Sequence, residues 1–151
     1  MKLFLLDKTP TNNFNSFQRM DLLEKEQLRV IIKQITKDYF KSYGEDAFFV
    51  THEKLLIRSE RTAVSVSPFN IKDNKDNFYH VVQEVYELKE LPFARLAVHE
   101  AMDGNYDYAH ELVVVSYLTD AFSETDAAAL LACIQCLQGI LKWDDVLLCK
   151  K

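Results

Sequence analysis

The chain has 151 residues, with 18 basic and 23 acidic side chains, and a sequence pI near 5.4. Its length suits one domain spanning residues 1–151, and its 48% hydrophobic and 27% charged content is ordinary for a soluble globular protein. Residues 1–75 carry a net charge of +3 and residues 76–151 a net charge of −8, and the sum of −5 argues against binding to nucleic acid, which needs clustered Lys and Arg. The acidic second half instead suits a basic partner.

The first elements are expected to be a short strand and a long helix. Lys2–Leu6 has strand character, and it lacks the length of a secretory leader or a membrane span, so we expect a cytoplasmic protein without a membrane partner. An odd number of cysteines, three, also points to a reducing compartment. A helix is predicted from Asp21 to a stop at Gly44, with an apolar stripe at helical spacing formed by Leu28, Ile31, Ile32, Ile35 and Tyr39.

The next stretch is predicted to be a three-stranded meander. Its strands are expected at Ala47–Thr51, Leu55–Arg58 and Ala63–Ser67, separated by short polar breaks. A second helix follows, because apolar residues from Phe78 to Leu88 recur at helical spacing up to the stop before Pro92.

A β-hairpin is predicted between Phe93 and Leu118. Apolar residues alternate in the first strand up to Met102, and the second strand contains the run Leu-Val-Val-Val, which is typical of a strand covered on both faces. Gly104 supplies the positive backbone angle that the turn between them needs.

A largely apolar helix is predicted from Ser123 to Trp143. The Ser123 hydroxyl can cap its free amides, and a helix apolar nearly all round must be buried on more than one side. Val146–Cys149 is expected to add a last short strand. The predicted fold is therefore α+β, a largely antiparallel sheet of meander and long hairpin packed by three helices, in the order β-α-βββ-α-ββ-α-β.

The motifs of the common enzyme classes are missing from the sequence. Three isolated glycines exclude phosphate-cradling loops and dinucleotide-binding folds. Cys133-Ile134-Gln135-Cys136 has a redox or zinc spacing, but it falls about three turns into an apolar helix, which favours buried and inert thiols. We predict no enzyme activity, no catalytic residue, no cofactor and no metal.

Two histidines of the predicted hairpin share one face of the sheet. His99 and His110 would lie near each other, so they could bind a metal or act as acid and base, but no third ligand is evident. Two histidines on a partly exposed sheet face are the preferred interpretation, and a small metalloenzyme remains an alternative.

The order of elements from residue 21 to 143 resembles the class I type III secretion chaperones and the related YbjN-like domains. The residues that carry this likeness are those of the meander (47–67), the hairpin (96–118) and the last helix (123–143), in which a Ser-x-x-Asp start follows the hairpin and Trp closes the helix.

The resemblance implies a homodimer without enzymatic activity that holds an extended segment of a client protein. The meander offers apolar side chains for such contacts, and its edge can pair with an extended peptide. The predicted partner-binding residues, each also a candidate for the core, are Phe48, Val50, Leu56, Ile57, Val64 and Val66. The alternative is an acidic immunity protein that neutralises a toxin, such as a nuclease, by direct binding.

Overall fold

The computed structural model describes residues 22–66, 73–85, 91–119 and 122–149, and this part of the chain is helical apart from two three-residue strands. In chain order the elements are α2 (Leu22–Tyr43), α3 (Glu45–Ser59), β1 (Val64–Val66), α4 (Asn74–Val85), α5 (Pro92–Met102), α6 (Tyr106–Leu118), α7 (Glu124–Gln138), α8 (Trp143–Val146) and β2 (Leu147–Cys149). None of the described helices is both long enough and apolar enough to cross a membrane.

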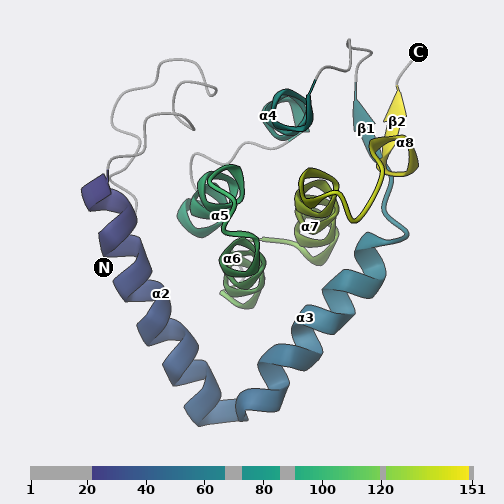
Figure 1. The fold of residues 1–151 in the computed structure, drawn as a ribbon. Helices are drawn as coiled ribbons and strands as arrows, with labels where there is room; N and C mark the ends of the chain where they lie inside the picture. Colours follow the sequence, from purple (N-terminus) through teal and green to yellow (C-terminus); the bar gives the residue numbers. More distant parts are fainter. Residues whose placement is uncertain (1–21, 67–72, 86–90, 120–121, 150–151) are drawn as a thin grey trace.

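Three helices lie side by side in the middle of the fold and two others enclose them. α5, α6 and α7 form the middle, while α2 and α3 are the arms of a V that meet at Gly44 (Figure 1). α4 packs on α7, and β1 pairs with β2 in parallel, with Val64 opposite Leu147. The V leaves the outer sides of α2 and α3 facing solvent.

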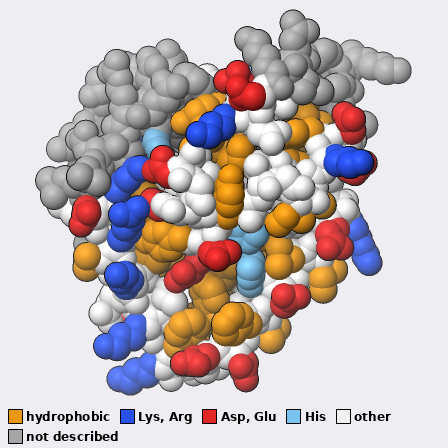
Figure 2. Space-filling view, in the orientation of Figure 1, with side chains coloured by type: hydrophobic (Ala, Val, Ile, Leu, Met, Phe, Trp, Pro, Cys, Tyr) orange, Lys and Arg blue, Asp and Glu red, His pale blue; other side chains and the backbone are white. Residues whose placement is uncertain are grey.

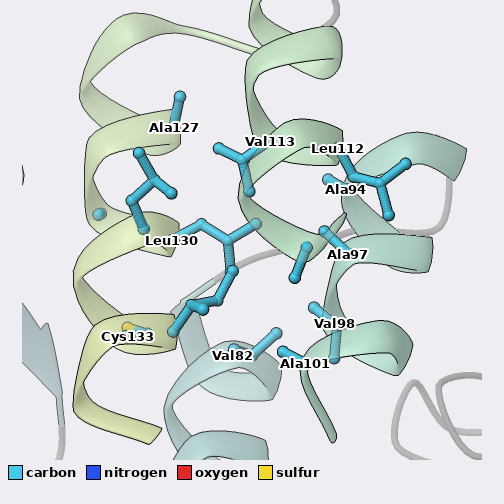
Figure 3. Close-up of a cluster of buried hydrophobic side chains, with 14 of the residues drawn as sticks. Val82, Ala94, Ala97, Val98, Ala101, Leu112, Val113, Ala127, Leu130 and Cys133 are labelled. Carbon is cyan, nitrogen blue, oxygen red and sulfur yellow. The ribbon is translucent and has the colours of Figure 1, made fainter. Parts of the chain in front are cut away.

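The core is built from small and medium side chains of the central helices. Ala94, Ala97 and Ala101 of α5 recur at helical spacing, and their methyl groups allow the neighbouring helices to approach closely (Figure 3). Leu112 of α6 and Leu130 of α7 are fully buried in the same cluster. One hydrophobic cluster joins these residues to buried side chains of α2, α3, β1, α4 and α8, and the partly buried Leu147 of β2 packs against it.

The predicted meander is wrong, because residues 45–59 form a single helix. Phe48, Leu55 and Ser59 are buried at spacings of seven and four residues, which is the period of a helix and not of a strand. Gly44, with φ of 87°, ends α2 and allows α3 to start at once. Only the third expected strand is present, as β1, and its neighbour is β2.

The predicted β-hairpin is also wrong, because its two arms are helices α5 and α6. Both are largely buried, so their apolar residues are distributed round the helix and do not mark one apolar face. Pro92 at the first position of α5 is a helix-start signal that outweighs the short alternation after it. Three consecutive valines, Val113–Val115, adopt helix because packing overrides their strand preference.

The α+β fold class is therefore contradicted, since the described residues contain no antiparallel sheet. Several local predictions are confirmed: α2 with its stripe, a helix after residue 73, the helix capped by Ser123, and a strand at the end as β2. The Ser123 hydroxyl accepts a hydrogen bond from the Asp126 amide at 3.1 Å. The strand expected at residues 2–6 lies outside the described residues.

The last long helix ends earlier than predicted. α7 stops at Gln138 because Gly139 adopts a left-handed conformation with φ of 86° as its C-cap, and the amide of Ile140 bonds back to the carbonyl of Gln135 at 2.9 Å. Trp143 instead begins α8, where its indole donates to Asn74 at 3.2 Å.

We expect Gly104→Ala to lower the free energy of unfolding by roughly 1 kcal/mol, because Gly104 has φ of 87° in the turn between α5 and α6. An added Cβ meets no atom within 4 Å, so the loss comes from backbone strain alone. Urea denaturation measures it, and Gly104→Asn is the matched control that should lose less. Unchanged stability of the alanine variant would contradict the positive φ.

Candidate functional site

Two histidines from different helices meet beside the end of α7. His52 of α3 and His110 of α6 approach with Nε2 and Nδ1 3.1 Å apart and their rings nearly perpendicular, at 82°. The other ring nitrogen of His110 lies 2.8 Å from the Oε1 of Gln138, the last residue of α7. In Figure 2 histidine side chains reach the surface near the middle of the visible face, bordered by hydrophobic and acidic ones.

The hydrogen bonds of this histidine pair have a definite direction. Because the Gln138 Oε1 can only accept, His110 carries its proton on Nε2, and its Nδ1 then accepts from His52 Nε2–H. Burial lowers the pKa of both histidines, and for His52 the neighbouring His110 lowers the pKa further. The pair is thus held neutral and links three helices.

The expected pairing of His99 with His110 is not found. His99 lies on α5, buried, and its Nε2 has no hydrogen-bond partner among the described residues. Burial, together with the positive charges of Lys25 and Arg95, lowers its pKa to about 4. His52 was expected in a turn, although its position between Phe48 and Leu55 at helical spacing could have placed it on the buried side of a helix.

A buried ion pair joins α2 to α5. Glu100 has a fully buried side chain, and both its carboxylate oxygens accept hydrogen bonds from Nη2 of Arg29, one of them at 2.9 Å. Asn105 donates to the same carboxylate at 3.2 Å, and the Arg29 guanidinium lies 5.9 Å from the ring centre of Tyr108. Lys25, one turn before Arg29, pairs with Asp103 at 3.1 Å. Lys25 and Arg29 therefore attach the first half of α2 to α5 and to the turn that follows it.

The cysteines of α7 are buried as expected. Cys133 and Cys136 are free thiols, and burial raises the pKa of both, that of Cys136 to about 12. Within the described ranges, no three His, Cys, Asp or Glu side chains are grouped so as to hold a metal ion.

The six predicted partner-binding residues fall into two groups. Phe48, Val64 and Val66 are buried in the core, and Leu56 packs against it while only partly buried. Val50 and Ile57 are 65% and 54% exposed. Because they lie seven residues apart on α3, they share its outer side, so a partner can reach only these two freely.

An exposed hydrophobic surface lies at the elbow where α2 meets α3. Tyr43, Phe49 and Val50 are 70%, 64% and 65% exposed, and we call these three residues the elbow patch. Tyr43 stacks on Tyr39, with ring centres 4.8 Å apart, and Tyr39 meets the edge of Phe48. Figure 2 shows hydrophobic, acidic and basic side chains together at the lower end of the molecule, where Figure 1 places the elbow.

A shallow depression of about 230 Å³ adjoins the elbow patch. It is lined by residues of α2 and α3 and of the end of α6, namely Ile35, Thr36, Asp38, Tyr39, Ser42, Tyr43, Phe48, Val115, Leu118 and Thr119. Tyr43 belongs to both the depression and the patch, so the two are continuous. The sequence indicated the exposed Val50 but gave no sign of the depression, which depends on three helices meeting.

Comparison with protein-family models, curated proteins and solved structures finds no match for this chain.

Protein stability should fall as the pH is lowered from 6.5 to about 4. Unfolded His99 takes up a proton below its ordinary pKa of 6.5, whereas folded His99 does so only near its pKa of about 4. The unfolded state therefore binds more protons in this window, and the stability lost across it amounts to roughly 3 kcal/mol from His99. His52 and His110 act in the same direction.

The measurement is urea denaturation at a series of pH values. The difference between the wild type and His99→Gln isolates His99, and the variant should show a flatter dependence between pH 6.5 and 4. Parallel curves for the two proteins would show that His99 titrates normally in the folded state.

We expect Arg29→Met to be more harmful than the double change Arg29→Met with Glu100→Gln. The single change leaves a fully buried carboxylate without its cation and should lower the free energy of unfolding by roughly 3 kcal/mol. The second change removes the buried charge and should restore part of that loss. Thermal and urea denaturation of both variants measure the effect, and a double variant no more stable than Arg29→Met would refute the ion pair.

Proposed function

We propose that this protein is a non-enzymatic protein-binding module that contacts a basic, folded partner through the elbow patch. The observation that carries the proposal is the exposure of three large apolar side chains, Tyr43, Phe49 and Val50, within eight residues of chain. Side chains of this kind are ordinarily buried, and an exposed group of them beside a depression is typical of an interaction surface.

The charged residues around the elbow patch indicate which charge a partner should carry. Glu45, Asp46 and Glu53 are exposed on α3 beside the patch residues, and Asp38 lines the depression. These four acidic residues outnumber the two exposed basic ones nearby, Lys41 and Lys54. An apolar centre with a polar, charged rim is the usual anatomy of a protein interface. Because acidic side chains predominate in this rim and the chain has a net charge of −5, a partner with basic residues around an apolar side chain fits best.

The sequence suggested two modes of binding, a chaperone that holds an extended client and an inhibitor that covers a toxin, and the helical fold favours the second. The likeness to secretion chaperones depended on the meander and hairpin, and both are helices here, so it no longer supports a client bound along a sheet edge. The described strands are three residues each and already pair with each other. The inhibitor mode, in which side chains of a helical surface cover a basic protein such as a toxin, needs no free strand, and we adopt it.

The test uses tagged full-length protein as bait in extract from its native cells, followed by binding measurements with the purified partner. We expect a basic protein whose binding is weakened about 30-fold or more by Val50→Asp, because a charge in the apolar centre of an interface removes a contact worth about 2 kcal/mol. Binding should also weaken as salt is raised.

The matched control is Val30→Asp on α2. Val30 is 68% exposed, almost the same as Val50, but it lies away from the elbow, so binding should be unchanged. Equal losses for the two variants, or a captured protein that is acidic, would rule out the elbow patch as the contact surface. A partner bound only in an unfolded, extended state would favour the chaperone mode instead.

A further inference from the structure

A second, basic hollow lies away from the elbow, where the end of α3 meets the start of α7. This cavity has a volume of about 580 Å³, and its charged lining residues are Lys54, Arg58, Arg61 and Glu124. Three positive and one negative side chain leave an excess of two positive charges. This local charge is opposite in sign to the net charge of the chain, which is −5.

The cations of this cavity are only partly neutralised within the protein. Glu124 pairs with Lys54 at 2.9 Å and with Arg58 at 3.1 Å, so one carboxylate serves two cations. The guanidinium of Arg61 makes no hydrogen bond or ion pair with any described residue. Arg58 and Arg61 flank Glu60 in the sequence, but Arg58 bonds across to Glu124 and Thr125 of α7.

Part of the cavity is already ordered for a ligand. Arg58 donates through Nη2 to the Thr125 hydroxyl at 2.9 Å and through Nη1 to Glu124, so its guanidinium is fixed from two sides. A side chain held in this way loses less entropy when it binds an anion. Ile57, 54% exposed, adds an apolar wall beside the cations.

We propose that this cavity binds the dianionic phosphate group of a small phosphomonoester or of free phosphate. A phosphate dianion matches the excess of two positive charges, and its oxygens can accept the paired donors of Arg58 and Arg61. The volume is within the range of small-ligand sites. Glu124 holds Lys54 and Arg58 in the absence of the ligand and competes with it. This site is separate from the elbow patch, and neither depends on the other.

The test is a titration of isotope-labelled full-length protein with inorganic phosphate at pH 7.5, followed by amide NMR shifts at constant ionic strength. We expect shifts confined to the end of α3 and the start of α7, with a dissociation constant on the order of 1 mM, as for an exposed site of few contacts. Chloride at the same ionic strength should not produce them.

Three variants are expected to affect the phosphate affinity differently. Arg61→Gln removes the unpaired cation and should weaken phosphate binding about tenfold, whereas Glu124→Gln removes the competing carboxylate and should strengthen it. Lys33→Gln, at an exposed position of α2, removes one positive charge elsewhere and should have no effect. Circular dichroism confirms that each variant is folded.

A parallel titration with phenyl phosphate distinguishes the two sources of the anion. Tighter binding than inorganic phosphate identifies a phosphomonoester whose apolar part contacts Ile57, and equal binding identifies free phosphate. The proposal fails if phosphate shifts are absent or scattered over the surface, if Arg61→Gln binds phosphate as tightly as the wild type, or if Lys33→Gln weakens binding as much as Arg61→Gln does.

Discussion

The burial of α5, α6 and α7 on almost every side is the constraint on which the rest of the structure depends. From Phe93 to Ala101 and from Leu112 to Ser116 every residue is buried, and the same holds from Ala127 to Leu137. Three such helices cannot be stable with any side open to water, so the remaining elements must cover them. The V of α2 and α3, with α4 and the β1–β2 pair, provides that cover (Figure 1).

Two sets of polar side chains are paired across helices inside this cover, and they fix how α2 and α3 attach to the central helices. Arg29 reaches the buried Glu100, and His52 joins His110 and Gln138 in one chain of hydrogen bonds. Each contact joins residues more than 25 positions apart in sequence, so it acts on the arrangement of helices and not on any single helix. The histidine pair links α3, α6 and α7, and burial lowers the pKa of both rings.

The outer side of α3 is left free by this arrangement, and it carries both of the surfaces for which we propose a role. Its beginning presents the elbow patch with acidic neighbours, and its end presents cations against the first turn of α7. One helix thus has an apolar, acidic end and a basic end, because its inner side alone is used for the core through Phe48, Leu55 and Ser59. Opposite charge at the two ends suits two different ligands.

The sequence by itself determined the features that depend on a few neighbouring residues. Ser123 caps α7, Gly44 and Gly104 adopt positive φ, α2 shows its stripe, and Cys133 and Cys136 are buried, because caps, turns and amphipathic periods are local properties. The same Gly104 serves a helical turn as well as it would serve a hairpin, which is why the correct angle led to the wrong element. The tertiary structure alone decided whether residues 93–118 are strand or helix, whereas the helical spacing of Phe48 and Leu55 could have indicated α3. Helices buried all round lose the 3.6-residue period, and their valines and phenylalanines favour a strand until packing overrides that preference. The tertiary structure also decided the hydrogen-bond partners of His110, Glu100 and Arg58. Each of these partners lies on another helix, so no sequence spacing indicates that the two side chains meet.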